Sequence, residues 1–363
     1  MTQGVAALFH GPGRPSELVE YPLRPPGPGE VLVRVRLSTV CGSDVHAWTG
    51  RRSLQTPAIL GHEIVGDIEA LGPDAPRDLL DRVLTPGKRV TWTEYIACGH
   101  CVPCVQLTLP QKCKKGRKYG HESAEEPPHL LGGFAQYCYL LPGTGIALVP
   151  PELTDAEAAP VNCGIATMVA VTEAAAIAPG DTVVVFGAGL LGLYGVAMAR
   201  AQGAAHVIAI DAVSARRTQA RRFGAHATHA PQEVEARAIG ATLQDYSRWG
   251  GADVVIETAG AAAALTEGLR LLRPGGRLVT AGLVVPGSLA TFDASEIVRR
   301  CATIRGVHNY APRHLVVALD FVREHHQRLP LADLVDMQVP LADVDAALAA
   351  SAARRALRPA VVP

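Results

Sequence analysis

The chain has 363 residues, which is enough for two domains, and its 34 Lys and Arg residues equal its 34 Asp and Glu residues. Because the formal net charge is zero, no long-range field would attract nucleic acid or an anionic membrane, and neither is an expected partner. No apolar run reaches the roughly 18 residues that span a bilayer. The N-terminal stretch also lacks a signal-peptide pattern, so a cytoplasmic location is expected.

The first part of the chain, residues 1–163, predicts a β-structure. It is rich in Gly and Pro and carries short β-branched runs. The run VLVRVRLS at 31–38 alternates apolar and polar residues with period two, which is typical of a half-buried strand. The segments at 58–71 and 88–95 follow a similar pattern. Together these strands predict a distorted β-barrel.

From about 164 to 304 the pattern changes to apolar strands that alternate with Ala-rich helices, which predicts a parallel sheet. The expected strands lie at 182–186, 206–210, 252–256, 277–281 and 302–306, with a weaker one near Thr228. Residues 305–363 contain helical patterns at 314–324 and 344–353 and end in LRPAVVP, which is expected to form an edge strand. The chain therefore predicts a nucleotide domain, 164–304, inserted into a first domain made of 1–163 and 305–363.

Four cysteines lie within one turn-rich stretch of the first domain. They are Cys98, Cys101, Cys104 and Cys113. Their spacing lets one loop fold its thiolates around a tetrahedral ion, and Zn²⁺ favours four sulfur ligands at about 2.3 Å. Because four protein ligands leave no open position, we predict a structural zinc site. Two other cysteines, Cys138 and Cys301, are expected to be small buried apolar side chains.

Cys41, His62 and Cys163 predict a second, open metal site. Cys41 follows a predicted strand, His62 begins another, and Cys163 lies at the junction with the nucleotide domain. Three ligands leave the fourth position of a zinc ion for water or a substrate oxygen, so the metal can polarise a carbonyl or lower the pKa of an alcohol. Glu63 is expected to support these ligands or to exchange with them. Two zinc ions per chain are therefore expected, one catalytic and one structural.

A glycine-rich motif predicts a dinucleotide site. It consists of Gly187, Gly189, Leu190, Leu191 and Gly192, between the strand DTVVVF and an Ala-rich helix. The glycines allow a tight turn, close approach of the pyrophosphate and close packing of helix on strand. Asp211 ends the next strand. A carboxylate there accepts hydrogen bonds from the ribose and repels a 2′-phosphate, which favours NAD over NADP. Arg216 lies just beyond and could instead tolerate a phosphate.

These motifs make the chain resemble the medium-chain, zinc-dependent alcohol dehydrogenases over essentially its whole length. The residues that carry the resemblance are Cys41, His62, Glu63, the four-cysteine loop, Cys163, the glycine motif and Asp211. The resemblance implies an α/β protein that combines a GroES-like β-barrel catalytic domain with a Rossmann doubly wound parallel sheet. Gly42, which replaces the basic residue of the liver and yeast types, favours the polyol and threonine dehydrogenase branches. Cys163, however, stands where polyol dehydrogenases carry a glutamate.

The resemblance also implies roles for single residues. Ser43 matches the hydroxyl that takes the proton of the substrate alcohol, and His46 matches the histidine that passes this proton through the ribose towards solvent. Arg358 matches a C-terminal arginine that binds the pyrophosphate.

Polar side chains flank the motifs expected near the active site. They are Trp48, Arg51, Glu94, Asn162 and His308. Because pockets bind apolar ligands through apolar lining, they predict a polar secondary alcohol (a polyol, cyclitol or amino alcohol) or the corresponding ketone as substrate. Arg51, with Arg52 beside it, could meet an anionic group of the substrate.

Two other interpretations of these motifs stay open. Tightly held NAD would allow a redox-neutral dismutase or epimerase, and cysteine clusters also occur in non-enzymatic zinc-binding proteins. The resemblance further implies a homo-oligomer, with a tetramer favoured over a dimer.

Overall fold

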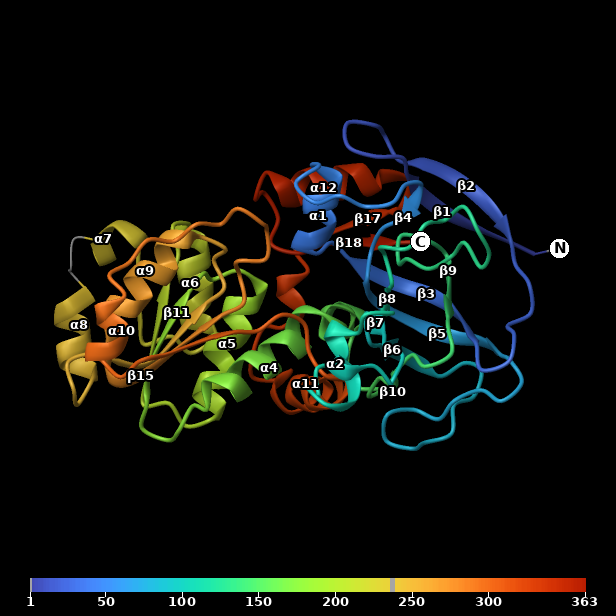
Figure 1. The fold of residues 1–363 in the computed structure, drawn as a ribbon. Helices are drawn as coiled ribbons and strands as arrows, with labels where there is room; N and C mark the ends of the chain where they lie inside the picture. The colour runs from blue at the N-terminus through green and yellow to red at the C-terminus, as the bar shows by residue number, and fades with distance from the viewer. Residues whose placement is uncertain (1, 236–238) are drawn as a thin grey trace. The chain divides into compact units, whose positions relative to one another are not determined.

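The computed structural model describes residues 2–235 and 239–363. The chain divides into two compact units, one formed by Met1–Ala166 and Ala311–Pro363 and the other by Thr167–Tyr310. Figure 1 shows that the chain enters the second unit once and then returns to the first. Both boundaries lie a few residues later in the chain than the expected ones at 163 and 304.

The first unit is built around a seven-stranded sheet with the strand order β10-β6-β5-β3-β18-β17, in which β9 also pairs with β3. Its strands are β3 (Val31–Thr39), β5 (Glu63–Leu71), β6 (Arg89–Trp92), β9 (Tyr137–Leu140), β10 (Ile146–Leu148), β17 (Met337–Pro340) and β18 (Pro359–Val362). A three-stranded sheet has the order β2-β1-β4, with β1 (Gln3–Phe9), β2 (Glu17–Pro22) and β4 (Ala58–Ile59). Side chains such as Val33, Ile64 and Trp92 form the core of this unit.

The strands predicted for the first domain are confirmed with adjusted ends. The run at 31–38 is β3, which pairs antiparallel with β5. The segment at 58–71 is not one strand, because it divides into β4 and β5 with Gly61 at a φ of +86° between them. A backbone in the left-handed region favours glycine, and this turn brings His62 to the start of β5.

The C-terminal strand is not at an edge, contrary to the prediction. β18 pairs antiparallel with β3 and parallel with β17, so it lies inside the sheet. The reason is β17, whose short sequence MQVP has no clear strand pattern. Its pairing partner β18 begins 19 residues after β17 ends, so local patterning does not reveal the contact.

The four-cysteine stretch lies in a loop between two very short strands, β7 (Tyr95–Ile96) and β8 (Arg117–Lys118), which pair antiparallel. The loop contains the helix α2 (Val102–Val105) and the 3₁₀ turn η1 (Pro110–Lys112). Because β7 pairs Tyr95 with Lys118, the two ends of the loop lie side by side.

Helices complete the first unit and the junction with the second. They are α1 (Gly42–Trp48), α3 (Asp155–Ala158), α4 (Gly164–Ala175), α11 (Pro312–His325) and α12 (Val344–Ala352), together with the 3₁₀ turns η2 (Ala159–Asn162), η3 (Ala332–Leu334) and η4 (Leu341–Asp343). The predicted helices at 314–324 and 344–353 are thereby confirmed as α11 and α12. In the described ranges no single helix is long and apolar enough to cross a membrane; the pair Asp155–Asn162 and Gly164–Ala175, bent by 56°, meets that test only when joined.

The second unit is a six-stranded, entirely parallel sheet with the order β13-β12-β11-β14-β15-β16. Its strands are β11 (Thr182–Phe186), β12 (His206–Ile210), β13 (Ala227–His229), β14 (Ala252–Glu257), β15 (Leu272–Thr280) and β16 (Thr303–Gly306). Its helices are α5 (Leu190–Ala201), α6 (Ser214–Arg222), α7 (Pro231–Glu235), α8 (Ile239–Tyr246), α9 (Ala262–Leu271) and α10 (Ser295–Arg299). This strand order is that of the Rossmann fold, so the predicted parallel sheet is confirmed.

Cys138 and Cys301, both expected in the core, differ in burial. Cys138 is fully buried on β9, as predicted. Cys301 is exposed, so that prediction is wrong. It follows α10 with a φ of +50°, and this turn directs it out of the apolar layer that the neighbouring Ala302 joins.

Candidate active site

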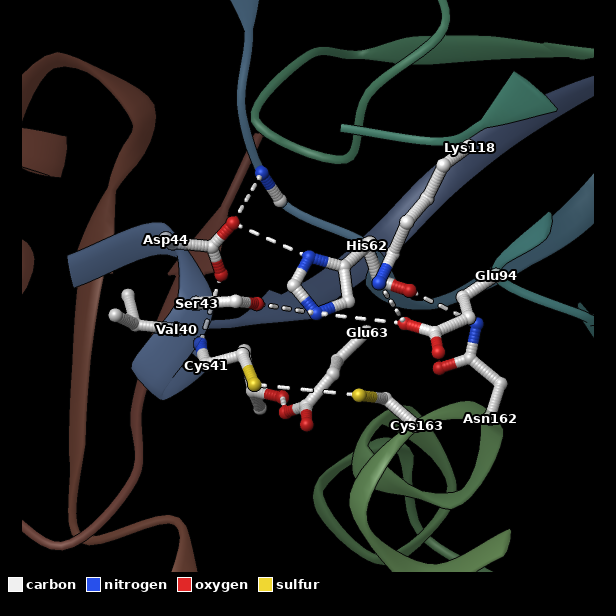
Figure 2. Close-up of polar contacts among 12 residues, drawn as sticks. Val40, Cys41, Ser43, Asp44, His62, Glu63, Glu94, Lys118, Asn162 and Cys163 are labelled. Atoms are coloured by element: carbon white, nitrogen blue, oxygen red, sulfur yellow. Dashed lines mark hydrogen bonds and ion pairs between the residues drawn. The ribbon is translucent and has the colours of Figure 1, made fainter. Parts of the chain in front are cut away.

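Three side chains from separate segments of the first unit form a compact cluster of metal-binding atoms. One ligand atom each of Cys41, His62 and Cys163 lies within 4.8 Å of the others. The two sulfur atoms are 4.0 Å apart. Cys41 caps the N-terminus of α1, His62 directly precedes β5, and Cys163 follows η2 (Figure 2). Two thiolates and one imidazole are a ligand set that suits Zn²⁺ and leaves one position for another ligand.

Asp44 holds two of these ligands in place. Its Oδ1 accepts hydrogen bonds from His62 Nδ1 and from the amide of Gly61, each at 3.2 Å. Its Oδ2 accepts from the amide of Cys41 at 2.8 Å. Because Nδ1 of His62 is engaged, Nε2 is the nitrogen that can bind a metal. Ser43 Oγ lies 3.2 Å from this Nε2, so the expected proton acceptor stands beside the ligand atoms.

Glu63 and Arg358 form a buried pair behind the cysteines. Glu63 Oε2 accepts a hydrogen bond of 2.5 Å from Thr39 and lies 3.4 Å from Arg358 Nη1. Arg358 also donates to the carbonyl of Val40 at 2.9 Å. Burial, only partly offset by Arg358, raises the pKa of Glu63 to about 8. Arg358, expected at the pyrophosphate, therefore contacts Glu63 and the backbone beside Cys41.

A second polar group lies on the other side of His62. Glu94 Oε2 is 3.8 Å from His62 Nε2 and 3.1 Å from Lys118 Nζ (Figure 2). Burial lowers the pKa of Lys118, but the carboxylate of Glu94 and the sulfur of Cys163 together outweigh burial, and the pKa of the lysine is raised. The ring of His121 lies 5.4 Å from that of His62, between centroids. Asn162 donates to the carbonyls of His62 at 2.9 Å and of Trp92 at 2.8 Å.

Four other residues were expected at the substrate or in proton transfer, and they differ in burial and in contacts. They are Trp48, Arg51, His308 and His46. Trp48 donates from its indole nitrogen to Asp345 at 3.2 Å and packs against an apolar cluster, so it fastens α1 to α12. Arg51 is exposed, and His308 is exposed in the second unit. His46 lies on α1, three residues after Ser43, where burial and the charge of Arg51 lower its pKa.

Sequence reasoning missed three residues of this site: Asp44, Lys118 and His121. A signal existed for Asp44, because it lies three residues after Cys41, where an acidic side chain can reach back to the first amide of a helix. Lys118 and His121 had no such signal. The pairing of β7 with β8 brings Lys118 next to Glu94, and His121 meets His62 only in the folded structure.

The four cysteines of the loop form a second cluster. One ligand atom of each of Cys98, Cys101, Cys104 and Cys113 lies within 4.8 Å of the others. The sulfur atom of Cys101 is 3.4 Å from that of Cys104 and 3.8 Å from that of Cys113. Four thiolates at these distances fit a tetrahedral zinc ion with no open position.

The glycine motif lies in the second unit, between β11 and α5. Gly187 has a φ of +93°, which glycine adopts readily, and Gly189 caps α5. A Cβ atom on Gly192 would overlap the carbonyl oxygen of Gly187, so only glycine fits there. Asp211 follows β12 and accepts hydrogen bonds from the amides of Ala188 at 2.7 Å and of Val213.

Two arginines follow Asp211, and they differ in their contacts. Arg217 donates to the carbonyl of Asp211 at 2.7 Å, so it supports the backbone of this turn. Arg216 lies half-buried on α6.

Comparisons with known proteins agree with this architecture. Residues 191–324 match the family model of zinc-binding dehydrogenases, and residues 27–151 match that of the alcohol dehydrogenase GroES-like domain. A 5-exo-hydroxycamphor dehydrogenase from Pseudomonas putida is 31% identical, and the match covers 95% of each chain. An L-threonine 3-dehydrogenase from Pyrococcus horikoshii is 31% identical over 86% of this chain and 84% of its own.

A solved structure is similar over the full length. The alcohol dehydrogenase from Thermotoga maritima covers 100% of both chains at 32% identity with a TM-score of 0.94. The Rossmann sheet, the GroES-like domain and the two cysteine-containing clusters thus occur in a chain whose relatives, over most or all of its length, are named dehydrogenases. The chain belongs to the zinc-dependent medium-chain alcohol dehydrogenase family.

Proposed function

We propose that this protein is a zinc-dependent, NAD(H)-linked alcohol dehydrogenase that interconverts a polar secondary alcohol and its ketone. The observation that carries the proposal is the cluster of Cys41, His62 and Cys163 with the hydroxyl of Ser43 3.2 Å from His62 Nε2. Zinc bound by the three ligands would lower the pKa of an alcohol in its remaining coordination position. A second zinc ion in the four-cysteine loop would be structural.

The chain's own residues supply the proton path in this proposal. Ser43 takes the proton of the substrate hydroxyl, because its oxygen lies beside the ligand atoms. His46 lies one helical turn further along α1, so the two side chains share one face of the helix. A neutral imidazole there can accept the proton and release it to solvent. Glu63 lies behind the ligands beside Arg358, and its carboxyl group would support a cationic centre there when it is ionised.

The preference for NAD over NADP rests on Asp211. Its carboxylate is fixed by the amides of Ala188 and Val213 at the end of β12. An anion held there can accept a hydrogen bond from a ribose hydroxyl and repels a 2′-phosphate. Arg217 donates to the backbone carbonyls of Asp211 and Ala212, so it supports the turn that carries this carboxylate.

The preference for a polar substrate rests on the buried ion pair of Glu94 and Lys118 beside His62. An aliphatic substrate could make no hydrogen bond to this ion pair, whereas a polar substrate could accept one from the ammonium of Lys118.

The test is NADH formation at 340 nm with polyols, cyclitols, amino alcohols and simple alcohols, run with NAD and NADP and with and without a chelator. Chelator-sensitive oxidation of a polar alcohol with NAD is the expected result. Chelator-resistant turnover would refute the zinc mechanism, and a preference for long-chain primary alcohols would refute the polar substrate. Nucleotide retained through desalting without net turnover would favour a redox-neutral reaction.

A further inference from the structure

The polar group beside the metal-binding cluster contains more than the expected Glu94, and this inference rests on the proposed function. Glu94, Lys118 and His121 come from the segments that enter and leave the four-cysteine loop. Glu94 Oε2 lies 3.8 Å from His62 Nε2 and 3.1 Å from Lys118 Nζ. The rings of His121 and His62 are 5.4 Å apart. All three side chains therefore lie beside the histidine that would hold the metal.

Lys118 and His121 have hydrogen-bonding capacity to spare. A lysine ammonium has three donors, and the contact with Glu94 engages one of them. Both ring nitrogens of His121 are buried and have no hydrogen-bond partner among the described residues. Because nearly all buried polar atoms in folded proteins are paired, a site built this way calls for a polar ligand.

The charged residues around this group determine which kind of polar ligand can bind there. The carboxylate of Glu94 could attract a substrate ammonium, but Lys118 already occupies that side of it. The charge of Arg52 also acts on both Lys118 and His121. A second ammonium would therefore meet positive charge, whereas an oxygen atom can accept a hydrogen bond from Lys118.

We infer that Lys118 and His121 bind an oxygen substituent on the substrate carbon next to the reacting carbinol, and that an ammonium group at that carbon is disfavoured. The oxygen can belong to a hydroxyl or to a carboxylate, since both accept from an ammonium. The inference narrows the proposed substrates to vicinal diols, polyols, cyclitols and hydroxy acids, and it sets amino alcohols aside. Lys118 and His121 are in this view specificity-determining residues.

A matched set of small alcohols tests this inference. Propan-2-ol, propane-1,2-diol, 2-hydroxypropanoate and 1-aminopropan-2-ol share the carbinol and differ only in the neighbouring group. Their binding to the zinc-loaded protein is measured by isothermal titration calorimetry with NADH present, so that no alcohol is oxidised. The wild type should bind the diol or the hydroxy acid about 10- to 100-fold more tightly than the amino alcohol. Tighter binding of the diol would identify the preferred substituent as a hydroxyl, and tighter binding of the hydroxy acid would identify it as a carboxylate.

Two variants assign the preference to residues. In Lys118→Met the diol and the hydroxy acid should lose about 10- to 100-fold in affinity, while the released carboxylate of Glu94 should improve binding of the amino alcohol. In His121→Phe the ring is kept, and only the oxygen-bearing ligands should lose affinity. Lys115→Met is the matched control, because Lys115 is an exposed lysine of the same loop.

Equal binding of all four alcohols by the wild type, or tighter binding of the amino alcohol, would overturn the inference. An equal loss for all ligands in both variants would also overturn it, because it would indicate a purely structural role. If the binding preference is found but no alcohol of the set reduces NAD and no corresponding ketone oxidises NADH, the inference stands and the proposed function fails.

Discussion

Replacing Asp44 with Ala should weaken zinc binding at the Cys41, His62 and Cys163 cluster and leave zinc binding at the four-cysteine loop unchanged. Asp44 is fully buried and accepts three hydrogen bonds, from the amides of Cys41 and Gly61 and from His62 Nδ1. The substitution leaves three buried donors unpaired and frees the imidazole to rotate. From the cost of unpaired buried groups we expect a loss of about 3–5 kcal/mol in the free energy of unfolding.

The affinity of the catalytic site for zinc should fall about 10- to 100-fold, the range found when a group that orients a metal ligand is removed. This corresponds to about 1.4–2.8 kcal/mol of binding free energy. The assay is a competition titration against a chromophoric chelator, in which the structural site serves as an internal reference. Asp44→Asn should show a smaller loss, because the amide keeps one acceptor oxygen.

Asp245→Ala is the matched control, since Asp245 is exposed on α8. It should leave both zinc affinities and the unfolding transition unchanged. If Asp44→Ala releases no zinc, or releases it from both sites alike, the assigned role of Asp44 in orienting His62 is refuted.

Three further substitutions test the other features. Cys104→Ser should lower the zinc content by one ion per chain and reduce resistance to urea, because it removes a thiolate of the four-cysteine cluster; an unchanged content by metal analysis would contradict the structural site. Asp211→Ser should lower kcat/KM for NAD about 10- to 100-fold and raise kcat/KM for NADP, as measured by initial rates at 340 nm. An unchanged ratio of kcat/KM for NAD to kcat/KM for NADP would show that Asp211 does not determine the cofactor preference. Gly192→Ala should weaken NAD binding and lower the free energy of unfolding by about 2 kcal/mol or more, because the new Cβ overlaps the carbonyl oxygen of Gly187. Nucleotide titration measures the NAD affinity, and urea unfolding measures the stability. Wild-type values of both would argue against close packing at Gly192.

The centre of the parallel sheet could be predicted closely because β11 (TVVVF) and β12 (HVIAI) are largely apolar runs between turns. β11 and β12 have the predicted bounds. β15 begins at Leu272, before the predicted 277, because the segment Arg-Pro-Gly-Gly that precedes the apolar run continues the strand. Propensity disfavours a strand there. Leu272 pairs with Ala252 of β14, and the pairing resumes only at Arg277 after a shift in register, so residues 273–276 are an irregular segment within the strand.

The candidate metal ligands could be proposed from residue type and spacing, but their supporting contacts could not. Cys, His and Cys in three segments indicate a zinc site wherever the fold brings them together. Which side of His62 faces the metal depends on Asp44, and Arg358 reaches Glu63 across nearly 300 residues of chain. Such contacts depend on how the first unit packs as a whole, and no local sequence pattern encodes them.

The four-cysteine loop contributes to the active site through its two ends. β7 and β8 are only two residues long, which is too short a pairing to be stable by itself. Yet this pairing holds Glu94 and Lys118 3.1 Å apart beside His62. Closing the intervening loop costs entropy, and zinc bound by the four thiolates would supply compensating free energy. A zinc ion in this loop would therefore help to keep the Glu94–Lys118 pair beside the Cys41, His62 and Cys163 cluster, although the four cysteines would touch no substrate.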